Sequence, residues 1–537
     1  MESRNRREES RIATEKEDSM NIREKTGFVC EEDYPVVATT EGKLRGFVDG
    51  DVFCFRGVDY AWAERFQMPE PPKSWEGIQD VLDYGYGCPE MSYSLKGKSP
   101  KGQFLVPQKF WSISEHCQNL NIWTKSIDPE AKKPVMVWFH GGGFFGGCST
   151  QLYSYEGWEM SHNYDVVIVT VNHRLNMLGF LDFSEMGEEY KNSGNLGMAD
   201  LVESLRWVKR NIAAFGGDPD NVTIYGQSGG GGKVSTLMQM PSADGLYHRS
   251  IIQSGVMRSG RLGGDRELSR RIGRKTIENL KLNKENIKEI ETIDYEVLAE
   301  AVFKACEEEG RHPFTVWSPV ADGEYFVGNP LVTGFRKETE NIPVIVGSCV
   351  CEFIPSPVGR KENWTEEQRK AVVEERFGEE TEAVMAAFAK AYPELDVSYA
   401  AAVDHEIRPA VLEFSRRRSE EAKAPVYNYI FAFESPLLGG QLTGHNGDLH
   451  FMFHNALYME AMYKKDVTVR LQEEMAGAWA GFAKTGSPNG EKLPTWEPYT
   501  EEKKACMIYG DKTVLQENHD EELVKLIENA PIPEKKL

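Results

Sequence analysis

One serine of the chain stands in a setting that favours nucleophilic chemistry. Ser228 is the central residue of the G-x-S-x-G run at 226–230. The β-branched residues in 222–225 predict a strand before this run, and residues 231–238 can begin a helix after it. A flexible loop would also explain glycines around a serine, but a tight turn from strand to helix requires them, because side chains there would collide. The flanking elements favour such a turn, with an exposed hydroxyl and helix amides facing developing negative charge.

Donors for that negative charge are suggested by a second glycine motif. A serine hydroxyl is a weak nucleophile near neutral pH, so the chemistry needs a base for its proton and donors for the oxyanion. Residues 140–144 (HGGGF) follow a predicted strand at 134–139. Glycines let backbone N–H groups approach a substrate oxygen, although a flexible turn is the alternative for a triple glycine alone. We expect the amides of Gly142, Gly143 and Gly229 to form an oxyanion hole.

The base must be found among eleven histidines. Enzymes with this serine turn carry their acid and then their histidine later in the chain, so only histidines well beyond residue 228 qualify. His445 lies in the glycine-bracketed segment 442–447, whereas His450 and His454 lie in an aromatic run. We favour His445 as the base, and His450 is the alternative.

An acid is needed to fix the imidazole tautomer and to stabilise its cation. Glu352 follows the predicted strand 342–347, at the expected catalytic end of the sheet, and precedes His445 in the chain. A solvated surface carboxylate is the alternative for this residue. With Glu352 as the acid, the residue types and their order predict acyl transfer through Ser228.

Short apolar segments between amphipathic stretches predict the elements that hold these residues. Strands are predicted at 134–139, 166–172, 222–225, 250–253, 342–347 and 426–433. Several are apolar throughout, as strands buried on both faces must be, which predicts a large, mostly parallel sheet flanked by helices. The three- and four-residue spacing of apolar side chains in 200–214 predicts a covering helix. The fold class is therefore α/β.

The remaining segments predict additions to this sheet. Residues 37–72 carry alternating apolar residues and glycine turns, which predict a small antiparallel sheet near the start. Charged, helix-rich stretches downstream of the serine predict helical cap elements at about 258–340 and 362–425. We expect one catalytic domain at 34–537, after a charged leader at 1–33.

Composition excludes several classes of function. The 62 basic and 84 acidic residues give a net charge of −22, which disfavours nucleic acid as a partner. The sequence lacks a run of about 18 apolar residues, as a membrane span needs, and the leader lacks the apolar segment of a signal peptide. We therefore expect a cytoplasmic monomer or small homo-oligomer. The nine cysteines show no metal-ligand spacing, and the chemistry requires no metal or organic cofactor.

With these residues assembled, the chain resembles the type-B carboxylesterases, a family of α/β hydrolases that also includes cholinesterases and some fungal lipases. The resemblance runs from about residue 37 to about residue 499. It is densest in four motifs that occur in the family's order: WFHGGGF (138–144), NHRL (172–175), GNLG (194–197) and FGGDP (215–219). Agreement of several motifs in order is more specific than any one of them.

The resemblance implies roles for individual residues. It implies the catalytic acid at Glu352 and the histidine at His445, and we expect Gln227, Phe144 and Trp317 to belong to the substrate pocket. For Trp317, which matches a position that often shapes the acyl pocket, a core aromatic is the alternative.

The resemblance also implies two structural pairs. Glu115 and Arg174 match a family ion pair, and Cys88 and Cys117 match positions within bonding reach of each other. We expect these two cysteines to remain thiols in the cell.

Two positions beside the serine depart from the family's pattern. Gln227 stands where the family usually has glutamate, and Gly229 stands where it usually has alanine. A carboxylate that would attract cationic substrates is thus absent, and a choline-ester preference is not expected. We expect hydrolysis of small or short-acyl neutral esters. The alternatives are a lipase acting on long-chain esters and a catalytically silent recognition protein on the same fold.

Overall fold

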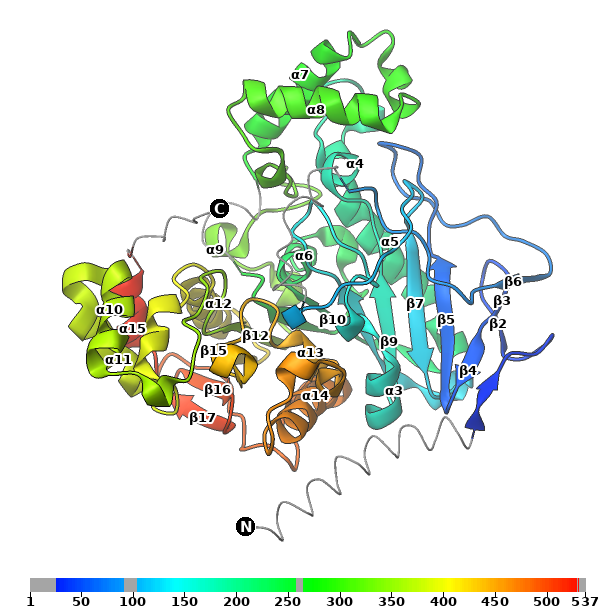
Figure 1. Cartoon of the computed structure of the whole chain (residues 1–537). Coiled ribbons are helices and arrows are strands. Elements are labelled where there is room, and N and C mark those ends of the chain that lie inside the picture. Colours follow the sequence, from blue (N-terminus) through cyan, green and yellow to red (C-terminus); the bar gives the residue numbers. More distant parts are fainter. Residues whose placement is uncertain (1–25, 91–103, 257–263, 529, 531–537) are drawn as a thin grey trace.

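The computed structural model of the chain describes residues 26–90, 104–256, 264–528 and 530, and a large central sheet dominates it (Figure 1). In chain order the strands of this sheet are β1 (Phe28–Val29), β4 (Phe47–Asp49), β5 (Val52–Asp59), β7 (Asn119–Thr124), β8 (Lys133–Phe139), β9 (Val167–Val171), β10 (Gly217–Gln227), β11 (Arg249–Gln253), β12 (Val344–Cys349), β13 (Val426–Phe431), β16 (Ala505–Tyr509) and β17 (Val514–Glu517). Their spatial order is β1-β4-β5-β7-β9-β8-β10-β11-β12-β13-β16-β17. Neighbours from β9 to β16 are parallel, and the pairs at both edges are antiparallel.

Helices cover both faces of the sheet. The described α-helices are α3 (Trp158–Tyr164), α4 (Asn176–Phe180), α5 (Leu196–Asn211), α6 (Gly229–Leu237), α7 (Arg266–Asn279), α8 (Tyr295–Glu308), α9 (Pro330–Thr333), α10 (Glu366–Phe377), α11 (Thr381–Ala391), α12 (Ile407–Glu421), α13 (Leu449–Met452), α14 (Thr468–Thr485) and α15 (Glu521–Ile527). Val135 and Val137 of β8 belong to one core with residues of α5 and α6, whereas Met136 and Trp138 belong to another with residues of α3 and α14. Successive side chains of a strand point to opposite faces, so an apolar strand fills both cores. The predicted α/β class, with a large, mostly parallel sheet flanked by helices, is confirmed.

The small sheet expected near the start is present, with two differences: one strand pair is parallel, and two strands of the expected segment lie in the large sheet. Strands β2 (Val36–Ala38) and β3 (Lys43–Arg45) pair antiparallel, and β6 (Ile78–Asp80) adds to β3 in parallel. Other strands of the segment 37–72, β4 and β5, instead join the antiparallel edge of the large sheet. Alternation of apolar residues indicates strands but does not indicate which sheet they join.

Two helical groups extend beyond the sheet. Helices α7 and α8 pack against each other at the top of the view, and α10 and α11 pack together at its left (Figure 1). Helix α12, by contrast, packs directly on strands β12 and β13. A short hairpin of β14 (Glu434–Ser435) and β15 (Gln441–Leu442) follows β13 and leads toward His445.

The ion pair implied between Glu115 and Arg174 is wrong, because each residue has another partner. Arg174 is 2% exposed and binds the fully buried Asp200 of α5 through two hydrogen bonds of 2.6 and 2.9 Å. Glu115 instead pairs with Arg65, whose guanidinium also donates to backbone carbonyls of the segment before α8. A buried guanidinium is most stable with a bidentate carboxylate, and Asp200 supplies one from the neighbouring helix.

Cys88 and Cys117 lie together in the core as free thiols. Both are buried. Burial raises the pKa of the Cys117 thiol well above its usual value, and Cys88 is one of the groups that raise it further.

Within the described ranges, no helix combines the length and the apolar character that crossing a bilayer demands.

Candidate active site

A cavity of about 1240 Å³ opens at the carboxyl ends of the central parallel strands. Its lining includes segments that follow β8, β10, β12 and β13 in the chain. Strand β8 lies between β9 and β10, so the chain crosses over β8 at this point of the sheet. Ligands of open α/β sheets bind where the strand order reverses in this way. The sheet therefore brings four distant segments of the sequence to one cavity.

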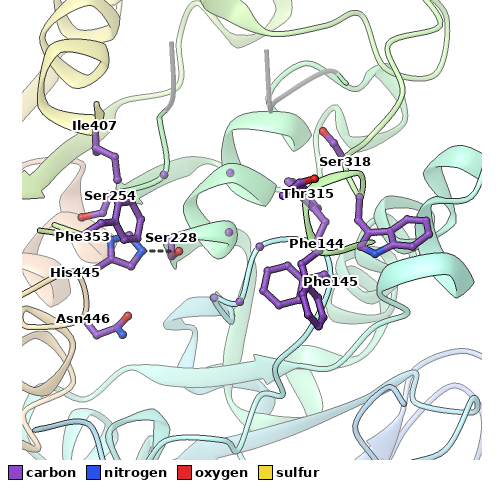
Figure 2. Close-up of a pocket in the computed structure, with 18 of the residues that line it drawn as sticks. Phe144, Phe145, Ser228, Ser254, Thr315, Ser318, Phe353, Ile407, His445 and Asn446 are labelled. Carbon is purple, nitrogen blue, oxygen red and sulfur yellow. Dashed lines mark hydrogen bonds between the residues drawn. The ribbon is translucent and has the colours of Figure 1, made fainter. Parts of the chain in front are cut away.

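Ser228 occupies a strained turn between β10 and α6. It has a φ of 57° and a ψ of −128°, an unfavourable backbone conformation for a residue other than glycine. A methyl group at Gly226 would overlap the backbone of Gly230, and one at Gly230 would overlap the carbonyl oxygen of Phe139. The Ser228 N–H donates to the Gln253 carbonyl at 2.8 Å, which ties the turn to β11. The predicted turn from strand to helix is confirmed, and it points the hydroxyl into the cavity (Figure 2).

Three predicted residues form a hydrogen-bonded chain in this cavity. Ser228 Oγ lies 2.6 Å from His445 Nε2 (Figure 2), and His445 Nδ1 is hydrogen-bonded to Glu352 Oε2. The His445 N–H also donates to the Glu352 carbonyl oxygen at 3.1 Å, so backbone and side chain fix the ring together. An imidazole held in this way presents its free nitrogen to the serine proton.

Glu352 is not a solvated surface carboxylate. It is 4% exposed, and its Oε1 accepts hydrogen bonds of 2.8 Å from the Cys349 N–H and the Ser254 hydroxyl. Those donors occupy one carboxylate oxygen and leave the other for His445.

Two further carboxyl groups are buried near Glu352. Burial, together with the charge of Glu352, raises the pKa of Asp404 to about 7. Burial also raises the pKa of Asp448 to about 6, although Gln253 and Tyr429 donate hydrogen bonds to it. Like charges disfavour each other in a low-dielectric interior, so these aspartates hold their protons to a higher pH than exposed ones.

We call residues 140–144 the glycine loop, and its residues 141–144 line the cavity beside the serine. Gly142 and Gly143 have φ values of 86° and 62°, in the left-handed region that favours glycine. A methyl group at Gly229 would overlap backbone atoms of Gly143. The departure from alanine at residue 229 therefore has a physical reason, since the loop lies directly against the start of α6. Gly142, Gly143 and Gly229 all border the cavity next to Ser228.

The expected pocket residues are divided by the structure. Phe144 and Trp317 line the cavity, with Phe144 on the side opposite His445 (Figure 2). Gln227 is fully buried and is not among the described residues of the lining. Its side-chain amide donates to the carbonyl of His445. A substrate contact does not fit this position, because the amide instead holds the segment that carries the histidine.

The alternative base, His450, lies outside the cavity lining described above. It is fully buried, and its Nδ1 is 2.5 Å from the Ser154 hydroxyl. Burial lowers the pKa of His450 to about 4, so it remains neutral near neutral pH. These surroundings give it a structural role.

Several aromatic residues of the cavity were not anticipated. The Phe353 ring lies 4.3 Å from the His445 ring between centroids, and Phe145 packs against Phe314 at 5.4 Å on the other side. Phe353 directly follows Glu352, and Phe145 directly follows the glycine loop. Both phenylalanines could therefore have been predicted from the sequence, because each is adjacent to a predicted site residue. Phe314 lies in a short 3-10 turn (Pro313–Thr315), three residues before the predicted pocket residue Trp317.

No set of three or more His, Cys, Asp or Glu side chains is arranged to hold a metal ion within the part of the chain that the structure describes.

Comparisons with known proteins agree with this geometry. A family model described as the carboxylesterase family matches residues 33–526. The chain is 30% identical over 501 residues to the para-nitrobenzyl esterase of Bacillus subtilis (strain 168), across 91% of this chain and 97% of that protein. It is 31% identical over 520 residues to carboxylesterase 4A of Bos taurus, across 88% of this chain and 91% of that protein.

Solved structures give the same result. An esterase from anaerobic Clostridium hathewayi that can hydrolyze aliphatic aromatic polyesters is 39% identical, with a TM-score of 0.86 over 93% of this chain and 98% of that chain. A PNB esterase structure is 29% identical, with a TM-score of 0.74 over 91% of this chain and 99% of that chain. The similarities thus extend over nearly the full length of these proteins.

Proposed function

The chain belongs to the carboxylesterase family and is a carboxylic-ester hydrolase, and on that premise we propose that it acts through a covalent acyl-enzyme on Ser228. The α/β-hydrolase fold that the resemblance implied is confirmed. One observation carries the proposal: Ser228 Oγ lies 2.6 Å from His445 Nε2, and His445 Nδ1 is bound to Glu352. Acyl transfer needs such a nucleophile, a base within hydrogen-bond reach and a group that orients the base.

The proposed reaction has two halves. In the first, His445 takes the Ser228 proton as the serine oxygen attacks the ester carbonyl, and the tetrahedral intermediate collapses when His445 protonates the departing alcohol. In the second, His445 removes a proton from water, the resulting hydroxide attacks the acyl-enzyme, and the carboxylic acid leaves as Ser228 regains its proton. Glu352 stays ionised throughout and stabilises the imidazolium.

The negative charge of both tetrahedral intermediates falls on the former carbonyl oxygen. We assign its binding to the N–H groups of Gly142, Gly143 and Gly229, which border the cavity beside Ser228. The close approach of Gly143 to Gly229 supports a compact set of donors. Preorganised donors of this kind act without rearrangement during the reaction, which makes them effective.

The substrates are small-molecule esters, and within that class we propose neutral esters with small or short acyl groups. Gln227 has no charge, and it faces the segment of His445 instead of the cavity. A second candidate is an ester with a bulky aromatic group. The 1240 Å³ cavity and the rings of Phe145, Phe314 and Phe353 in its lining favour it, as does the activity on aliphatic aromatic polyesters of the Clostridium hathewayi relative.

A series of p-nitrophenyl esters with acyl chains from acetyl to palmitoyl tests this proposal. We expect kcat/KM to be highest for acetyl to hexanoyl esters and to fall by at least about tenfold for the palmitoyl ester. The reason is that methylene groups of a long acyl chain that do not fit the acyl pocket weaken transition-state binding. p-Nitrophenyl benzoate belongs in the same series. A higher kcat/KM for benzoate than for every aliphatic ester selects the aromatic candidate, and a maximum at long chains contradicts the proposal in favour of a lipase.

Three broader expectations accompany this function. We propose a single catalytic domain at 34–537 with helical cap elements, and the positions of α7, α8, α10 and α11 within the expected ranges support it. We also propose a cytoplasmic protein that is a monomer or a small homo-oligomer. The charged leader expected at 1–33 lies mostly outside the described residues, which begin at Thr26, but its end differs from the expectation, because Phe28–Val29 form β1 and pair with β4 at the edge of the central sheet.

A further inference from the structure

A buried lysine lies behind the glycine loop. Lys233 is 0% exposed and belongs to α6, four residues after Gly229, so the two residues share one face of the helix. Its Nζ donates to the carbonyl oxygens of His140 and Gly143 at 2.9 and 3.0 Å. Along the chain, these two carbonyls lie on either side of the N–H groups of Gly142 and Gly143, which we assign to the oxyanion hole. One side chain thus connects both ends of the loop to the helix that begins at the nucleophile.

The charge of this lysine is unusual for its surroundings. Lysine is almost never fully buried without a carboxylate, yet no carboxylate of the described residues forms an ion pair with Lys233. The titratable groups beside it are His140 and His173, whose pKa values burial and the lysine charge both lower well below normal. The Phe144 ring lies 5.7 Å from Nζ. Two carbonyl dipoles and an aromatic face are therefore what stabilise the ammonium.

The helix surface permits this close connection. A methyl group at Gly229 would overlap Gly143, so the loop can lie against α6 only because residue 229 has no side chain. Gly229 allows the approach and Lys233 holds it. Burial lowers the pKa of Lys233 to about 7, the cost of keeping a cation in this place.

We propose that Lys233 is a positioning residue that clamps the glycine loop onto α6, so that the N–H groups of Gly142 and Gly143 face the oxyanion together with that of Gly229. When it is protonated, the Lys233 ammonium also favours the negative charge that develops in front of the loop. The inference rests on the proposed acyl-enzyme mechanism. Because the clamp acts on oxyanion donors, it affects the transition state more than the binding of the neutral ester.

The test compares Lys233→Met with a matched variant, Lys361→Met. Lys361 is also buried, at 6% exposure, and its Nζ also donates to backbone carbonyls, those of Pro357, Gly359 and Gly440, but these carbonyls lie outside the glycine loop. For each folded variant, kcat and KM are measured with p-nitrophenyl butyrate. The inhibition constant of a trifluoromethyl ketone is measured in parallel, because its adduct with the serine places an oxyanion in front of the loop.

We expect Lys233→Met to lower kcat by about 10- to 100-fold with KM within about twofold, and to weaken the trifluoromethyl ketone by the same factor as kcat. Lys361→Met should lower the Tm and leave kcat within about twofold. A Lys233→Met enzyme with unchanged kcat overturns the clamp. So does a fall in kcat that leaves the inhibition constant unchanged, or an equal fall in kcat in Lys361→Met.

A second variant covers the case in which Lys233→Met does not fold. Gly229→Ala keeps the lysine and pushes the loop away from α6, and we expect the same loss of kcat and of ketone affinity with little change in KM. Unchanged kcat in Gly229→Ala then overturns the inference. Ser228→Ala, measured beside these variants, distinguishes the mechanism from the role of Lys233. Full activity without the Ser228 hydroxyl contradicts the acyl-enzyme mechanism. An inactive Ser228→Ala, together with unaltered activity in the Lys233 and Gly229 variants, contradicts the clamp alone.

Discussion

Replacing Ser228 with alanine is expected to lower kcat for p-nitrophenyl butyrate hydrolysis by about 10⁶-fold. The variant loses the hydroxyl oxygen that lies 2.6 Å from His445 Nε2. Catalysis that remains will come from the oxyanion donors and from substrate binding alone. The fold should persist, because the strained φ of 57° at this position is a property of the backbone and a smaller side chain adds no contact. Steady-state kinetics and circular dichroism on the same preparation check both expectations.

Ser235→Ala is the matched control for this substitution. Ser235 is a buried serine of α6, the helix that follows Ser228, and its hydroxyl has no hydrogen-bond partner among the described residues. We expect kcat within about twofold of the unmodified enzyme. Residual activity above about 1% in Ser228→Ala, in a preparation free of the unmodified enzyme, would mean that another group carries the nucleophilic step.

Replacing His445 with alanine should have an effect of similar size, about 10⁵- to 10⁶-fold in kcat. Without the imidazole, nothing takes the proton as Ser228 attacks, and nothing returns it to the leaving alcohol. The two losses are not additive, so the double variant with Ser228→Ala should be about as inactive as either single variant. Kinetics of the three variants on one ester measure this directly.

His450→Gln distinguishes the two histidines that the sequence left as candidates. His450 is bound to Ser154 in the core and is absent from the cavity lining, so its replacement should lower the Tm and leave kcat within about threefold. The opposite pattern, an active His445→Ala beside a folded but inactive His450→Gln, would transfer the role of base to His450.

The local motifs made much of this site predictable. The glycines at 226 and 230 indicated the turn at Ser228, because no other residue fits between that turn and Phe139. The apolar character of 134–139 and 166–172 indicated strands buried on both faces, and β8 and β9 fall within about one residue of those ranges. Because ligands of parallel α/β sheets bind at the carboxyl ends of the strands, the predicted parallel sheet also indicated which edge holds the site.

Contacts between distant segments were less predictable. The family resemblance implied an ion pair between Arg174 and Glu115. In the structure, Arg174 instead pairs with Asp200 of helix α5. The family resemblance implied that Gln227 belongs to the substrate pocket, yet its side chain points toward the His445 segment and donates to the His445 carbonyl. For Lys233 the sequence predicts only a place near the start of a helix. Its two carbonyl partners become apparent only from the packing of α6 against the glycine loop. Such pairings depend on helix rotation and loop path, which residue patterns do not specify.

The most direct test of the central claim is the reaction of the folded enzyme with a fluorophosphonate probe, followed by peptide mass mapping. The probe reacts with a serine activated by a neighbouring base, so it reports the nucleophile independently of substrate choice. We predict one adduct, on Ser228, that is lost in Ser228→Ala and formed at least about 1000-fold more slowly in His445→Ala. A folded enzyme that hydrolyses esters while Ser228 stays unmodified would contradict the account.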